Sequence, residues 1–266
     1  MSTLRASVAF AALAVSACAV APPPTKQELA MVDQASQPLL PASRAERDQA
    51  DQQDLLSQAK FWNTEYEKNP NDYETALKYA RVLRAIGSTP RSSEVAAQAL
   101  TMKPADVDLT LVFAQDSLDQ GKPEDAATAL ARAEAAGQND WRMLSIIGVT
   151  MDALDQHKPA QDYYKRALAL SPDNPKILSN LGLSYLLDGN AGLGEETLRH
   201  AVSLPSADSR VKQNLILALG VQGKFDEADK AAGSDLPKAL VDANRDYFHS
   251  MLNPSRTWDS LRGAQN

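Results

Sequence analysis

From residue 73 to residue 233 the sequence repeats with a period of 34 residues, and no insertion or deletion interrupts the register. In four of the five copies a small residue stands at the eighth position, and in four a glycine stands at the fifteenth: Ala80, Ala114, Gly148 and Gly182, then Gly87, Gly121, Gly189 and Gly223. Small side chains let two antiparallel helices approach closely, and a glycine after the first helix supplies the left-handed residue that ends it. The period therefore predicts a solenoid of stacked helix–turn–helix units.

Five copies fit this register, near residues 73–106, 107–140, 141–174, 175–208 and 209–233. The pattern resembles the tetratricopeptide repeat, most clearly over 175–202 and 214–232. The resemblance implies an all-α, right-handed solenoid of about five helix–turn–helix repeats. Two residues depart from the pattern: Asp155 replaces the turn glycine, and Ile216 fills a small site. They put local geometry in question but leave the architecture as expected.

Both flanks of the repeats carry helical patterns. Leu55, Ala59, Trp62 and Tyr66 share one face over residues 48–68, which predicts a leading helix or half-repeat, so that the solenoid spans 46–233. Residues 236–252 read as a final helix that covers the open end, because a terminal repeat otherwise exposes its core. We therefore expect residues 234–266 to form a capping helix followed by a loose tail.

The N-terminus has the layout of an export signal. In residues 1–17 a short polar start with Arg5 precedes an apolar run that is too short to span a bilayer. The sequence Val15-Ser16-Ala17-Cys18 resembles a bacterial lipobox, which implies a lipid on the Cys18 thiol; an ordinary cleaved signal is the alternative. Residues 18–45 then form the lipidated cysteine and a flexible Pro/Ala-rich tether to the membrane. With Ala19 after the cysteine, the resemblance implies the outer membrane of a Gram-negative cell.

Composition excludes several classes of function. Loss of Arg5 leaves 27 − 1 = 26 basic residues against 34 acidic ones, so the mature chain is acidic, with a net charge of −8, and we expect it not to bind nucleic acid. With one cysteine there is no intrachain disulfide framework. His157, His200 and His249 have no metal-site spacing, and Asp152 with Asp155 is at most a weak cation candidate. We expect no catalytic residue, metal or cofactor.

What remains is a surface for a partner. In this repeat type the first helix lines a concave groove through positions 2, 5, 9, 12 and 13. Charged and polar residues occupy these positions in early copies: Glu74, Arg81, Arg84, Asp108, Gln115 and Asp119. Apolar residues occupy them in later copies and form our hypothetical partner groove: Val149, Leu183, Leu186, Leu187, Leu217 and Val221. Either an amphipathic partner helix or the chain's own capping helix covers this groove.

Asn180 and Asn214 resemble part of the carboxylate clamp of chaperone-binding tetratricopeptide-repeat proteins. Ser145 and Val149 stand where that clamp has lysine and asparagine, so the clamp is not inferred.

The segment 209–252 resembles the TadD family, the lipoproteins of tight-adherence (Tad, or Flp) pilus systems, through R-x-x-x-N-L, then L-G-x-Q-G-x-F-x-E-A, then D-L. The resemblance implies an outer-membrane lipoprotein on the periplasmic face, with a pilotin-like role toward the pilus secretin or other assembly components. The alternative is a periplasmic adaptor for peptidoglycan enzymes, proteases or an outer-membrane assembly machine.

Overall fold

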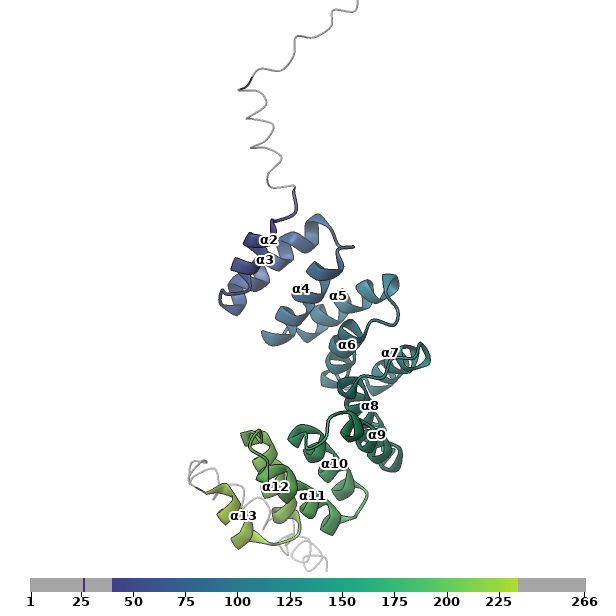
Figure 1. Cartoon of the computed structure of the whole chain (residues 1–266), viewed down its shortest axis with the longest axis vertical. Coiled ribbons are helices and arrows are strands. Elements are labelled where there is room, and N and C mark those ends of the chain that lie inside the picture. The colour runs from purple at the N-terminus through teal and green to yellow at the C-terminus, as the bar shows by residue number, and fades with distance from the viewer. Residues whose placement is uncertain (1–25, 27–39, 234–266) are drawn as a thin grey trace, which may run out of the picture. The chain divides into compact units, whose positions relative to one another are not determined.

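A computed structural model describes residue 26 and residues 40–233 of the chain. The chain divides into two compact units, residues 1–41 and 42–266, and the second holds nearly all the described residues. Over this described part the backbone forms twelve helices and no strand (Figure 1). The signal region, Cys18 and the expected capping helix at 236–252 lie outside the described residues.

Ten of these helices form five pairs. The first helices of the pairs are α4 (Tyr73–Ala85), α6 (Val107–Asp119), α8 (Trp141–Ala153), α10 (Pro175–Leu187) and α12 (Ser209–Val221). The second helices are α5 (Thr89–Met102), α7 (Pro123–Ala135), α9 (His157–Leu170), α11 (Ala191–Ser203) and α13 (Phe225–Ala232). Every first helix begins 34 residues after the previous first helix, and the second helices follow the same spacing. The prediction of an all-α repeat solenoid is confirmed.

Each first helix begins at a side chain that caps it. The residue before each first helix accepts a hydrogen bond from a backbone N–H of the first turn: Asp72, Asp106, Asp140, Asn174 and Asp208. Such a cap satisfies a donor that has no partner within the helix. One capping residue every 34 positions therefore fixes where each repeat starts.

The turns inside the pairs are also alike. The turn glycines have φ between 69° and 81°, and Asp155 adopts the same left-handed region with φ 57°. After each turn residue a backbone N–H reaches back to the last turn of the first helix, as from Gln156 to Met151 at 2.8 Å and from Asn190 to Tyr185 at 2.8 Å. Asp155 thus departs from the repeat pattern in sequence but keeps its geometry.

The leading segment, expected as a helix or half-repeat over residues 48–68, consists of two helices, and the second of them carries Leu55, Ala59, Trp62 and Tyr66. These are α2 (Arg44–Ala50) and α3 (Leu55–Lys68). The break has a local cause, because Asp54 accepts from the backbone N–H groups of Leu56 and Ser57 at 3.0 Å and so begins a new helix. A capping box of Ser43 and Glu46 begins α2, two residues inside the expected tether.

The helices stack in chain order. Each helix packs on the next one, and the first helices also contact one another, α4 with α6, α6 with α8, α8 with α10 and α10 with α12. The small residues of the repeat lie at these close contacts: Ala80, Ala114, Ala126, Ala160, Ala133, Ala167 and Ala201 are all fully buried. Larger side chains such as Leu144 and Tyr164 fill the layers between. The first helices therefore form a continuous wall along one face of the stack.

Candidate functional site

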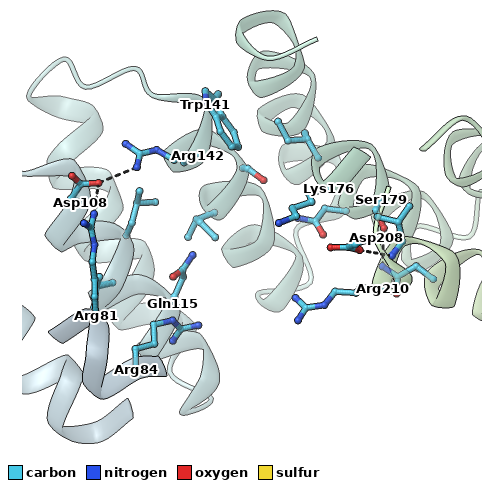
Figure 2. A pocket seen from close by; sticks show the side chains of 18 residues that line it. Arg81, Arg84, Asp108, Gln115, Trp141, Arg142, Lys176, Ser179, Asp208 and Arg210 are labelled. Carbon is cyan, nitrogen blue, oxygen red and sulfur yellow. Dashed lines mark hydrogen bonds and ion pairs between the residues drawn. The ribbon is translucent and has the colours of Figure 1, made fainter. Parts of the chain in front are cut away.

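The wall of first helices encloses a cavity of about 560 Å³ (Figure 2). Side chains from α4, α6, α8, α10 and α12 all contribute to it, so it runs across every repeat. Several polar side chains line it: Arg81, Arg84, Asp108, Gln115, Arg142, Lys176, Asn180, Arg210 and Asn214. Trp141 and Ile146 add apolar surface. A concave surface shared by five helices of one solenoid is suited to hold an extended ligand.

The charge of the wall changes sign along the chain at one repeat position. The second residue of the first helix is Glu74 in α4 and Asp108 in α6, but Arg142, Lys176 and Arg210 in the next three. A cation in the first turn of a helix opposes the helix dipole, at a cost of about 0.3–1 kcal/mol at each site. Three consecutive cations at this position therefore work against local stability, and such conflicts are expected at functional sites.

Arg142 belongs to an ion-pair cluster that joins α4, α6 and α8. Asp108 lies 3.0 Å from both Arg81 and Arg142 and bridges α4 to α8 through α6. Asp140 accepts from Arg142 at 2.9 Å as well as capping α8. The hydrogen bond from Arg142 lowers the pKa of the Asp140 carboxyl, and Asp140 in turn raises the pKa of Arg142. The cluster holds two arginines and two aspartates, so it has no net charge.

Arg84 is held in a second cluster with α6. Its Nη1 lies 2.6 Å from Asp116 and 2.7 Å from Asp119. The side chain of Asp116 is fully buried, and burial raises the pKa of its carboxyl. Two acids therefore face one guanidinium, and the α4–α6 end of the wall has no excess positive charge.

Lys176 and Arg210 are different. Both are exposed, both line the cavity, and neither makes an ion pair with any residue that the structure describes. The nearby acid on the wall, Asp208, accepts the backbone N–H of Val211 at 3.1 Å as the cap of α12. Figure 2 shows the two basic side chains extending into the same open space. The α10–α12 end of the cavity thus carries two cations outside any ion pair of the described residues and one carboxylate, that of Asp208, which leaves an excess of positive charge.

Amide groups lie beside these cations. Asn180 in α10 lines the cavity and makes no side-chain hydrogen bond within the described part of the chain. Asn214 in α12 also lines the cavity and donates through Nδ2 to Ser179 Oγ at 2.8 Å. The asparagines that resembled part of a carboxylate clamp therefore line the cavity near Arg210, whereas Ser145 supplies only a hydroxyl.

The six residues of the hypothetical apolar groove fall into two groups. Leu187, Leu217 and Val221 are exposed by 61%, 41% and 40%. Val149 and Leu183 are half-buried, and Leu186 packs against the core around Leu198, between α10 and α11. None of the six lines the cavity described above. The exposed members lie further along the first helices, beyond the cations.

Sequence reasoning stopped at these leucines and overlooked Arg142, Lys176 and Arg210. The repeat register contained the signal for these cations, because the second residue of the copies changes from acidic to basic between Asp108 and Arg142. Of the charged and polar residues expected in the groove, Arg81, Arg84, Asp108 and Gln115 do line the cavity. Glu74 and Asp119 do not, although Asp119 contacts Arg84.

Asp152 and Asp155, the cation site considered from the sequence, have different surroundings in the structure. Asp152 accepts hydrogen bonds from neighbouring helices, and Asp155 lies in the turn after α8. No group of three or more His, Cys, Asp or Glu residues that could hold a metal ion occurs in the described part of the chain. Within residues 40–233, none of the helices has the length and apolar character needed to cross a membrane.

Comparison with known sequences gives a short family match. A tetratricopeptide repeat model matches residues 111–150, which cover most of α6, all of α7 and most of α8. An uncharacterized protein, y4yS, of Sinorhizobium fredii (strain NBRC 101917 / NGR234) is 27% identical over 111 residues, which are 42% of this chain. The chain spans about 60% of the length of that relative.

Comparison with solved structures extends the likeness to most of the stack. A thermophilic TPR protein of Thermus thermophilus is 20% identical, with a TM-score of 0.53 over 62% of this chain and 90% of that one. MamA from Desulfovibrio magneticus RS-1, from residue 41 to its end, is 17% identical, with a TM-score of 0.54 over 62% of this chain and 94% of that one. A chain of the APC/C hetero-tetramer Cut9–Hcn1 is 18% identical, with a TM-score of 0.60 over 74% of this chain and 40% of that one. At these identities the likeness concerns the fold, which is the tetratricopeptide-repeat solenoid.

Proposed function

We propose that this tetratricopeptide-repeat chain is a non-enzymatic assembly factor that holds a protein partner in the groove of its first helices. The observation that carries the proposal is the cavity of about 560 Å³ with Lys176 and Arg210 unpaired on its wall. A helix stack fixes these side chains before a partner arrives, which reduces the entropy lost on binding. The hydroxyl groups that line the cavity, those of Ser145 and Ser179, make no hydrogen bond with an acid or a histidine among the described residues, so positioning a partner is the role that the chemistry of the cavity favours.

The partner that we propose is the secretin or another assembly component of a tight-adherence pilus. The support is the resemblance of residues 209–252 to the TadD family, together with the lipobox-like sequence that ends at Cys18. A lipid on Cys18 would tether the solenoid to the periplasmic face of the outer membrane through residues 19–45. From there a pilotin-like protein reaches a secretin without entering the bilayer itself.

Replacing Cys18 by serine tests the anchor. The serine hydroxyl does not take the place of the thiol in lipid transfer, so the variant is expected to remain an unprocessed, unlabelled precursor. Cells fed a clickable palmitate analogue should label the wild-type chain and leave Cys18→Ser at background. Equal labelling of the two proteins would contradict lipidation and favour an ordinary cleaved signal.

Photocrosslinking from the groove tests the partner. A benzoyl-phenylalanine at Leu217, which is 41% exposed on α12, should crosslink to a pilus component in whole cells. Leu170, 47% exposed at the end of the second helix α9, is the matched control, because it lies outside the wall of first helices to which Leu217 belongs. Mass spectrometry of the adduct identifies the partner.

Three results would count against the proposal. Equal crosslinking from Leu217 and Leu170 would mean that the groove is not the binding face. A peptidoglycan enzyme, a protease or an assembly-machine subunit in the adduct would replace the pilus role by the adaptor role. An adduct within the chain, to residues 234–266, would show that the protein's own C-terminal segment fills the groove.

A further inference from the structure

We propose that the partner segment is an amphipathic helix with acidic side chains along one flank and apolar side chains along the other, lying across α10 and α12. This inference deepens the proposed function and rests on it, because it states the chemistry of the segment that the groove takes. It follows from two rows of side chains on the same two helices.

The first row is cationic and lies at the start of the helices. Lys176 and Arg210 occupy the second residue of α10 and of α12, and neither has an ion-pair partner among the described residues. The other basic residues of the cavity, Arg81, Arg84 and Arg142, already contact two aspartates each or share one. Excess positive charge is therefore confined to this end, on a chain whose formal net charge is −7. A carboxylate is the group that such a row selects.

The second row is apolar and lies near the end of the same helices. Leu183 and Leu187 follow Lys176 by seven and eleven residues, and Leu217 and Val221 follow Arg210 by the same steps. At 3.6 residues per turn, both steps return to within about 20° of the starting direction, so each helix presents its cation and its two apolar residues on one face. Leu187, Leu217 and Val221 are exposed by 61%, 41% and 40%, which leaves the row open to a partner.

The separation of the rows matches the width of a helix. Seven residues of α-helix advance about 10 Å, and a helix with its side chains is about 10–12 Å across. A helix laid at right angles over α10 and α12 would therefore touch the cations with one flank and the leucines with the other. Neighbouring packed helices lie about 8–10 Å apart, so such a helix meets both α10 and α12 within about two of its turns.

Charge favours a separate partner over the chain's own C-terminal segment. Residues 234–266 contain four aspartates, four lysines or arginines and no glutamate, so their formal charge is 4 − 4 = 0. A segment with as many cations as carboxylates can cover the apolar row but brings no net negative charge to Lys176 and Arg210. An acidic segment satisfies both rows at once.

A display experiment tests this chemistry directly. The probe is a phage library of helical peptides about 18 residues long, five turns of helix, selected on the immobilised full chain. Apolar residues are fixed at i, i+3, i+4 and i+7, and each flanking position carries Glu, Gln or Lys at random. The readout is the ratio of Glu to Lys on the flank in the bound pool relative to the input pool.

The wild-type chain should enrich Glu over Lys by about tenfold or more, and added salt should reduce the preference because the charges are exposed. The groove variant Lys176→Glu with Arg210→Glu should lose or invert it. A negative charge at these helix starts suits the helix dipole, so this variant should melt no earlier than the wild type. The matched control is Lys158→Glu with Arg132→Glu, the same change of charge at exposed positions of the second helices α9 and α7, and it should select as the wild type does.

The inference is overturned if the flank shows no preference, if the groove variant keeps the wild-type preference, or if no peptide is recovered above the bare support. It also fails, with the proposed function intact, if Leu217 crosslinks a pilus component through a segment without acidic residues. A clear acidic preference with no crosslinked partner in cells would leave the groove chemistry standing and refute the assembly role.

Discussion

Replacing Gly182 by leucine is expected to destabilise the C-terminal repeats by about 3 kcal/mol or more, near the upper end of the usual cost of overpacking. Gly182 lies in α10 where it crosses α11. A Cβ placed on Gly182 would lie 2.7 Å from Leu198 Cγ and 3.0 Å from the carbonyl oxygen of Gly194. The second of these neighbours is backbone, so no side-chain rotation relieves it.

Gly194 of α11 is as close to the backbone of α10 as Gly182 is to the backbone of α11. A Cβ on Gly194 would lie 2.8 Å from the carbonyl oxygen of Gly182. Two facing glycines thus let α10 and α11 touch backbone to backbone, and even Gly182→Ala should cost about 1–3 kcal/mol. Thermal or urea melts followed by circular dichroism measure the loss.

Gly192 supplies the matched control. It lies in α11 with no atom within 4 Å of where its Cβ would be, and without a positive φ. Gly192→Ala should therefore raise the free energy of unfolding by about 0.4–1 kcal/mol, because alanine has less conformational freedom to lose on folding. A Gly182→Leu protein that melts with the wild type would contradict the packing of this helix pair.

The repeat fold was predictable because small residues leave a periodic mark in a single sequence. Small side chains such as Ala80, Ala126 and Ala133 are constrained by the neighbouring helix, whatever partner the protein binds. Asp155 was the informative exception: its left-handed φ of 57° keeps the turn without glycine. Aspartate tolerates that region better than most residues, so the departure in sequence carried little structural weight.

The site was only partly predictable, since position on a helix does not reveal how charges are compensated. Arg142 and Lys176 hold the same place in consecutive repeats. Arg142 is neutralised by Asp108 and Asp140, whereas Lys176 has no ion-pair partner in the described part of the chain. Likewise Leu186 and Leu187 are adjacent, yet one packs between helices and the other is 61% exposed. These differences arise from contacts between repeats, and the sequence period alone does not contain them.

Asp152 also makes contacts between repeats that the sequence period does not contain. Its removal is expected to destabilise the protein by about 3 kcal/mol, the upper end of the cost of an unpaired buried polar group. Its carboxylate joins three helices. Ser184 of α10 donates through Oγ to Oδ1 at 2.7 Å, and Tyr164 of α9 donates through its hydroxyl to Oδ2 at 3.0 Å. His157 Nδ1 lies 2.9 Å from Oδ1. Burial, with the nearby Asp152 charge, raises the pKa of Tyr164, which keeps its hydroxyl protonated and donating.

Asp152→Ala leaves the buried hydroxyl of Tyr164 without its acceptor and leaves Ser184 Oγ only the longer contact to the carbonyl oxygen of His157 at 3.4 Å. An unpaired buried polar group costs about 1–3 kcal/mol. Asp155→Gly is the matched control, because Asp155 is exposed and already holds a glycine-like φ. It should leave the melting temperature unchanged or slightly higher, since glycine enters the left-handed region without strain. Asp152 and Asp155, which sequence reasoning grouped as one cation site, should thus differ in their effect: Asp152→Ala should cause a large loss of stability and Asp155→Gly none.

A double-mutant cycle identifies the cause of the loss. If the unpaired Ser184 hydroxyl contributes to it, Asp152→Ala combined with Ser184→Ala should cost less than the sum of the two single changes, by about 0.5–3 kcal/mol. Additive costs would mean that Asp152 acts through Tyr164 and His157 alone. An Asp152→Ala protein as stable as the wild type would show that the three-helix network does not hold α8, α9 and α10 together.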